Sequence, residues 1–72
     1  MGITLNKKTR KLVVSYPIED ICKDYETIKQ VVYKCRGEGL RCYFTIDSNK
    51  KRRYFIISSE DWKILHEFSK QL

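Results

Sequence analysis

The sequence predicts an α+β domain in which a small antiparallel sheet carries two helices on one face, in the order (β)βαββα. Three observations support this prediction. A helical apolar period runs through the first half and ends at glycines, two β-rich runs joined by a short polar link follow, and a second amphipathic stretch comes last. With 72 residues, 42% of them apolar, the chain is expected to form one domain, 1–72, with a thin core.

The first part of the chain contains two extended runs, Ile3–Leu5 and Lys11–Tyr16, on either side of the polar link Asn6–Arg10. The second run is rich in β-branched and aromatic residues, so we predict a strand there. The first run fits either a short edge strand or a loose terminus.

A long helix is expected next. Pro17 should end the strand and occupy the first helical turn, a position that suits proline. Apolar side chains then recur within an arc of about 140° at 100° per residue. They are Ile18, Ile21, Cys22, Tyr25, Ile28, Val32 and Cys35. The helix should end near Arg36, because Gly37 and Gly39 supply the backbone conformations of a C-cap.

The segments Arg41–Asp47 and Arg52–Ser58 are predicted to form an antiparallel hairpin, since the link Asp47–Lys51 contains the turn formers Ser48 and Asn49. Side chains alternate between the two faces of a strand. If Phe55 joins the core, the open face of the hairpin carries Arg41, Tyr43, Arg52 and Tyr54. If Tyr54 is buried instead, that aromatic surface is lost.

The last segment is predicted to be a helix that starts at Ser58, where Asp61 three residues on resembles a capping box, or at the alternative cap Ser59. Its apolar residues share a face about 100° wide, flanked by Trp62 and His66. The residues on that face are Ile64, Leu65, Phe68 and Leu72. We expect His66 to pack against the Trp62 ring.

The chain is strongly basic, with fifteen Lys and Arg against nine Asp and Glu and a formal net charge of +6. This charge favours polyanionic partners, although it also serves solubility. Eight cations stand in two clusters near predicted turns. They are Lys7, Lys8, Arg10 and Lys11, and Lys50, Lys51, Arg52 and Arg53. Cations at sheet edges also guard against unwanted strand pairing, which is the competing explanation. The distance between the clusters depends on a topology that the sequence leaves open.

The sequence contains no glycine-rich phosphate loop, no His-x-x-x-His pair and no nucleophile motif, so we predict a protein without catalysis or cofactor. Cys22, Cys35 and Cys42 match no common zinc spacing and are interpreted as small buried hydrophobes of a reducing cytoplasm. No apolar run approaches the roughly 20 residues that cross a membrane.

The leading prediction is a cytoplasmic, non-enzymatic protein that binds DNA or RNA. Lys50, Lys51, Arg52 and Arg53 would hold phosphates, Tyr43 and Tyr54 would stack on bases, and Arg41 with the Lys7–Lys11 cluster would widen the contact. The alternative is a protein-interaction module, a small regulator that docks on an acidic surface. A ribonuclease toxin that uses His66 is the third hypothesis. The composition also suits a viral or mobile-element protein, and a homodimer fits so small a domain.

Overall fold

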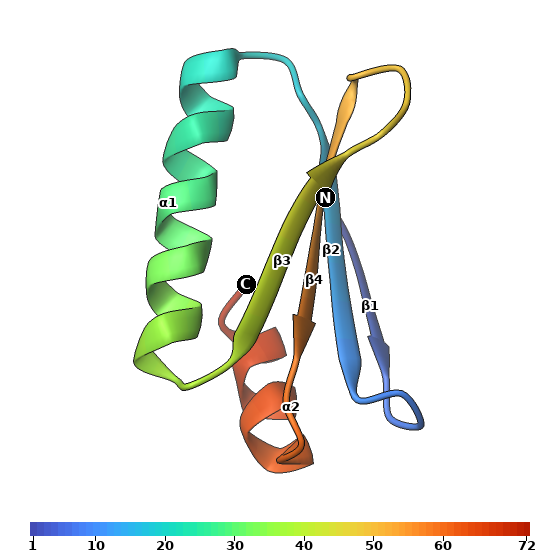
Figure 1. Cartoon of the computed structure of the whole chain (residues 1–72), viewed down its shortest axis with the longest axis vertical. Helices are drawn as coiled ribbons and strands as arrows, with labels where there is room; N and C mark the ends of the chain where they lie inside the picture. The colour runs from blue at the N-terminus through green and yellow to red at the C-terminus, as the bar shows by residue number, and fades with distance from the viewer.

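The computed structural model describes all 72 residues and contains four strands and two helices in the order ββαββα (Figure 1). The strands are β1 (Gly2–Asn6), β2 (Lys11–Pro17), β3 (Arg41–Ile46) and β4 (Arg52–Ser58). The helices are α1 (Ile21–Gly37) and α2 (Trp62–Lys70). The predicted α+β fold is therefore confirmed, and the first extended run is an edge strand rather than a loose terminus.

The strands form one antiparallel sheet in the order β1-β2-β4-β3. Two hairpins, β1–β2 and β3–β4, are joined because β2 pairs with β4 over its whole length, from Lys11 opposite Ser58 to Pro17 opposite Arg52. β1 and β3 are consequently the two edges of the sheet. The turn between β1 and β2 lies at one end of the molecule and the turn between β3 and β4 lies at the other (Figure 1).

The core lies on one face of the sheet, where both helices pack. Leu12, Val14, Phe55 and Ile57 are at most 2% exposed and come from the two central strands. The helices and the segment after α1 add Val31, Cys35, Leu40, Leu65 and Phe68. Of the two alternatives that the sequence left open, the structure has Phe55 in the core, together with Ile57, and Tyr54 on the opposite face, which has no helix on it.

The start of α1 and its buried face differ from the prediction. Pro17 is the last residue of β2, and the helix begins only after Asp20, whose carboxylate accepts hydrogen bonds from the backbone N–H groups of Cys22 and Lys23. The predicted end is correct, because α1 stops at Gly37 and Gly39 adopts a φ of 71°.

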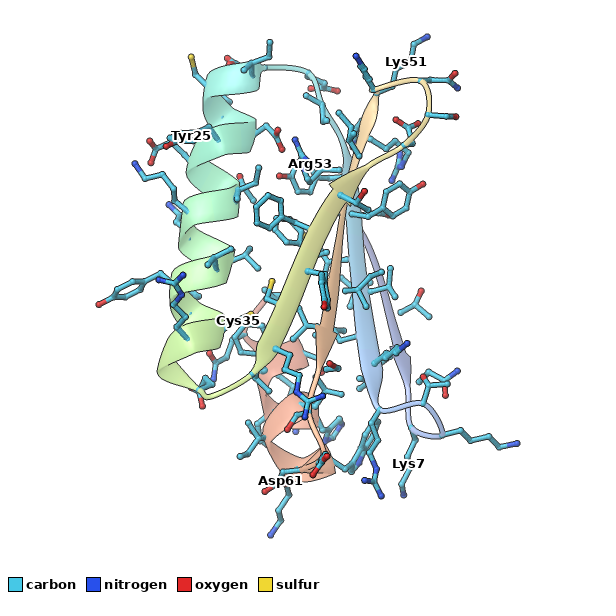
Figure 2. The ribbon with its side chains drawn as sticks, viewed as in Figure 1. Lys7, Tyr25, Cys35, Lys51, Arg53 and Asp61 are labelled. Carbon is cyan, nitrogen blue, oxygen red and sulfur yellow. The ribbon has the colours of Figure 1, made fainter.

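The helix also turns a different face to the sheet. Its buried residues are Asp24, Val31 and Cys35, whereas Ile21 and Tyr25 are 80% and 60% exposed. Tyr25 points away from the sheet (Figure 2). The centre of the buried face lies about 80° around the helix from the centre of the predicted apolar arc, at 100° per residue.

The N-cap of α2 is Asp61, so neither Ser58 nor Ser59 caps the helix. The Asp61 carboxylate accepts hydrogen bonds from the backbone N–H groups of Lys63 and Ile64. Ser58 instead ends β4, and the Ser59 hydroxyl accepts from the Asp61 N–H. None of the helices combines the length and the apolar character needed to cross a membrane.

Candidate nucleic-acid interface

The face of the sheet without helices, here called the open face, carries the predicted aromatic and basic side chains in rows across the strands. One row joins Lys11, Ser58 and Arg41. The next joins Val13, Ile56 and Tyr43, and a third joins Ser15, Tyr54 and Thr45. Arg52 lies beyond the third row, opposite Pro17. Two tyrosines thus lie between cations along a track of roughly 20 Å, at about 3.3 Å per residue.

The register places Tyr43 and Tyr54 diagonally across β3 and β4, within reach of each other's rings. Tyr43 is 74% exposed, because β3 is an edge strand, whereas Tyr54 on the central strand β4 is half-buried. Arg52 on the same face donates a hydrogen bond of 3.2 Å from Nη2 to the Ser15 hydroxyl. Ser15 and Ser58 belong to this surface, and strand alternation alone could have identified both.

A tight turn at the tip of the β3–β4 hairpin presents Lys50 and Lys51 to solvent. The Asp47 carboxylate accepts hydrogen bonds from the backbone N–H groups of Lys51 at 2.7 Å and Arg52 at 3.0 Å. These bonds stabilise the charged form of the Asp47 carboxyl and hold its pKa below the usual range. The Asp47 carboxylate therefore fixes the turn, and it forms no ion pair with Lys50 or Lys51.

The β1–β2 turn at the other end holds Lys7, Lys8 and Arg10. Asn6 stabilises it by accepting hydrogen bonds from the backbone N–H groups of Lys8 and Thr9. The Lys7 ammonium lies 5.8 Å from the centre of the Trp62 ring, on the helix side.

A hollow of about 200 Å³ adjoins this turn and has no apolar lining residue. Its lining residues are Thr9, Arg10, Lys11, Arg41, Ser58, Ser59 and Glu60. Arg41 makes only a loose pair of 3.7 Å with Glu60, and both side chains are well exposed. Three cations and three hydroxyl groups around one hollow are groups that bind phosphate oxygens.

The two predicted cation clusters lie at opposite ends of the sheet. Lys51 and Lys7 mark the two ends in Figure 2. The clusters cannot act as one compact site, but the open face connects them.

Arg53 does not join the exposed cations, which corrects its predicted role. Its guanidinium lies on the helix side of the sheet and forms a bidentate pair with Asp24, from Nε to Oδ1 at 3.1 Å and from Nη2 to Oδ2 at 2.8 Å (Figure 2). The side chains of Arg53 and Asp24 are only 15% and 8% exposed. The Tyr16 hydroxyl donates a third hydrogen bond, of 2.6 Å, to Asp24 Oδ1.

These contacts shift all three pKa values. Hydrogen bonds from Arg53 lower the pKa of Asp24, and the same pair raises the pKa of Arg53. Burial and the bond to the Asp24 carboxylate raise the pKa of Tyr16 to about 12. The sequence analysis missed Asp24, although its spacing of four, seven and eleven residues from Ile28, Val31 and Cys35 places it on one helical face with them.

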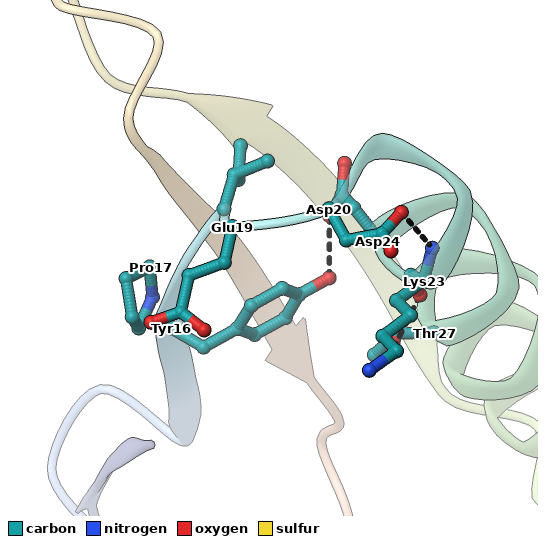
Figure 3. A pocket seen from close by; sticks show the side chains of 8 residues that line it. Tyr16, Pro17, Glu19, Asp20, Lys23, Asp24 and Thr27 are labelled. Carbon is teal, nitrogen blue, oxygen red and sulfur yellow. Dashed lines mark hydrogen bonds between the residues drawn. The ribbon is translucent and has the colours of Figure 1, made fainter.

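Beside this group lies a hollow of about 190 Å³ between the end of β2 and the start of α1 (Figure 3). Two of its three carboxylates have structural partners, since Asp20 caps α1 and Asp24 holds Arg53 and Tyr16, whereas Glu19 forms no ion pair. No three His, Cys, Asp or Glu side chains are grouped as metal ligands in the structure.

The histidine and the three cysteines have separate environments. His66 stacks on Trp62 with ring centres 5.7 Å apart and planes 10° apart, as expected. Cys35 is buried, Cys42 is half-buried and both are free thiols, whereas the free thiol of Cys22 is exposed in the first turn of α1. The buried-hydrophobe interpretation is thus wrong for Cys22. A hydrogen bond to Cys42 and burial raise the pKa of the Cys35 thiol.

Charge is divided between the two layers of the fold. The sheet layer, residues 1–17 and 41–58, contains nine cations and one carboxylate, a formal charge of +8. The helix layer, residues 18–40 and 59–72, contains six cations and eight carboxylates, a formal charge of −2. The strand residues on the open face include no carboxylate.

No family model matches the chain, and the searches found no significantly similar curated protein or solved structure.

Proposed function

We propose that this protein is a cytoplasmic, non-enzymatic nucleic-acid-binding protein that contacts single-stranded segments of DNA or RNA with the open face of its sheet. The single observation that carries the proposal is the division of charge, which still leaves a formal +7 on the sheet layer and −1 on the helix layer when the buried Arg53–Asp24 pair is set aside. A polyanion is attracted to the sheet side, where exposed side chains able to neutralise phosphates surround two aromatic rings.

The contacts have different roles. Lys11, Arg41 and Arg52 on the open face would neutralise backbone phosphates, and the hollow beside Arg41 would receive one of them. Tyr43 would stack on a base, an interaction worth about 1–3 kcal/mol per base. Tyr54 offers less ring surface because it is half-buried. The turn residues Lys8, Arg10, Lys50 and Lys51 would extend phosphate contact past both ends of the track, whereas the Lys7 ammonium lies over the Trp62 ring on the helix side.

The test is fluorescence anisotropy with labelled twelve-nucleotide single strands of DNA and RNA and with a matched duplex, at several salt concentrations. A triple variant, Lys11→Ala, Arg41→Ala and Arg52→Ala, should flatten the logarithmic salt slope by about 2, at roughly 0.7 per phosphate contact for single strands. The matched control removes three cations from the helix layer, Lys34→Ala, Lys63→Ala and Lys70→Ala. Equal slopes for the two triple variants would show that net charge alone, rather than the open face, drives binding.

Stacking has its own matched pair of variants. Tyr43→Leu should weaken single-strand binding about fivefold to a hundredfold, the loss of one stacked base. Tyr33→Leu removes an equally exposed ring from α1, 80% against 74%, and should leave binding unchanged. Absence of binding by the wild-type protein at about 100 mM salt would contradict the proposal as a whole.

A further inference from the structure

A second surface, independent of the open face, lies along the free edge of β3. Backbone pairing alternates along an antiparallel strand pair, and the Asp47 N–H bonds to the Arg52 carbonyl at 3.1 Å. Thr45, Tyr43 and Arg41 therefore direct their backbone groups toward β4. Their neighbours Cys42, Phe44 and Ile46 direct N–H and C=O groups outward, to the side where the sheet has no further strand.

The side chains of those outward-bonding residues lie on the helix side, and two of them are poorly covered. Phe44 is 49% exposed and Ile46 is 38% exposed, although both face the layer that contains α1. Between β3 and α1 runs an open groove of about 410 Å³. It is lined by Ile28, Lys29, Val32, Tyr33, Arg36 and Phe44.

The edge is also unguarded. Protected edge strands usually carry a bulge, a proline or charged side chains along their length. β3 pairs with β4 without a bulge, and its only charged residue is Arg41 at its first position. β1 is the other edge of the sheet, but no groove adjoins its residues. Ile3 on β1 is 43% exposed, but a free strand edge and an adjoining groove with apolar lining coincide only at β3.

The charges of the groove indicate which charge its partner carries. Its ionic lining residues are Lys29 and Arg36, and no carboxylate lines it. Lys29 makes one loose pair with Glu26, at 3.7 Å and with both side chains more than half exposed, which is worth little. A second copy of this chain, paired edge to edge about a twofold axis, would bring these same cations together. Charge therefore favours a different chain that carries carboxylates.

We propose that the β3 edge and the adjoining groove bind an extended peptide segment of another protein, which adds a fifth strand to the sheet. The segment presents alternate apolar side chains to Phe44, Val32 and Tyr33, and carboxylates to Lys29 and Arg36. Main-chain hydrogen bonds provide affinity in this mode, and the groove provides selectivity. The site shares no side chain with the open-face track, so peptide and nucleic acid can bind together.

The probe is a synthetic nine-residue peptide, acetylated and amidated, in which Val, Phe and Val alternate with Thr and each end carries Glu. Added to the ¹⁵N-labelled protein, it should shift the amide NMR signals of Cys42, Phe44 and Ile46 and those of α1 around Val32. A version with Lys in place of both Glu residues should bind at least about tenfold more weakly, because its charges repel Lys29 and Arg36. Equal binding of the two versions, or shifts confined to Tyr43 and Tyr54, would overturn the proposal.

Two further variants test strand addition itself. Backbone N-methylation of the apolar peptide residues removes the donors that an antiparallel fifth strand directs to β3, whereas methylation of its Thr residues removes those of a parallel strand. Loss of binding in one version but not in the other supports the proposal and identifies the strand direction. Strand addition would be refuted if both methylated peptides still bind, and this test leaves the protein itself unchanged.

On the protein side, Phe44→Glu should abolish binding of the acidic peptide, because it removes the apolar ring and places a carboxylate in the groove that repels the Glu residues of the peptide, whereas Thr45→Glu on the opposite face of β3 should not. Analytical ultracentrifugation of the free protein shows whether it forms edge-to-edge dimers. A dimer that Phe44→Lys abolishes would assign the surface to a second copy and overturn the proposal.

Discussion

The buried pair between Asp24 and Arg53 should contribute more to stability than any other ion pair of this protein. Asp24→Asn keeps the size of the side chain and its ability to accept from Tyr16, but it leaves the Arg53 guanidinium buried without a counter-charge. Both partners are largely removed from water, so solvent screens the loss only slightly. Removing one member of a buried pair costs about 3–5 kcal/mol. We expect about 3 kcal/mol, because the amide retains one acceptor.

A domain of this size has roughly 4–11 kcal/mol of stability in total, so a loss of 3 kcal/mol is large but measurable. Urea denaturation followed by circular dichroism gives the free energy of unfolding. With a slope near 1 kcal/mol per molar for a small domain, the midpoint should fall by about 3 M.

The matched control is Glu26→Gln, which breaks the exposed 3.7 Å pair with Lys29 on the same helix. Such a pair contributes about 0–1 kcal/mol. If Asp24→Asn and Glu26→Gln shift the midpoint equally, burial of the Arg53 pair is not what stabilises the packing of α1 on the sheet, and the reasoning fails.

Two other stability predictions follow from local geometry and from the pKa shifts. Gly39→Ala should cost about 1 kcal/mol in urea denaturation because Gly39 has a φ of 71°, whereas Gly37→Ala, at a helical position with open space around it, should cost nothing; equal costs would contradict this. The free energy of unfolding should be highest at a pH between the titration of the Asp24 carboxyl and the titration of the Tyr16 hydroxyl. Asp24 has a lowered pKa, so its contribution is present above the unfolded value near 3.8 and is lost as pH falls through the folded pKa. Tyr16 has a raised pKa, so its contribution is present below pH 10 and is lost as pH rises to about 12. Tyr16→Phe should abolish that alkaline component in unfolding curves, and an unchanged alkaline loss in this variant would assign it to other groups.

Strand alternation predicted the sheet well. The sequence around Phe55 and Ile57 alternates apolar residues at a period of two, and burial of every second residue then fixed the direction of Tyr54. The same reasoning on β3 predicted that the Tyr43 side chain lies on the open face. Hairpin pairing of β3 with β4 followed from the short link, because few connections other than a hairpin are possible at that length.

The helix faces were harder to predict because polar residues occupy buried positions. Asp24 lies on the sheet side of α1 and is satisfied by Arg53 and Tyr16, two partners distant in sequence. A count of apolar residues gives such a position no weight, so the predicted arc shifted toward Ile21 and Tyr25. Arg53 was misassigned for the same reason, since a run of four cations does not reveal which of them has a buried partner.

The separation of the cation clusters depends on strand order, which short-range patterns do not encode. Pairing of β2 with β4 sends the two hairpin turns to opposite ends. Had β1 and β2 entered the sheet in the reverse direction, Lys7 and Lys51 would lie at the same end.

The unequal charges of the two layers also give the protein a permanent dipole moment along the axis that runs through the sheet. In the field of a polyanion such a molecule experiences a torque that turns its positive pole forward. Rotational diffusion is thereby biased before any contact forms, so a larger fraction of encounters begins with the uncovered sheet facing the partner. The helices, on the trailing side, would stay directed to solvent and away from that partner.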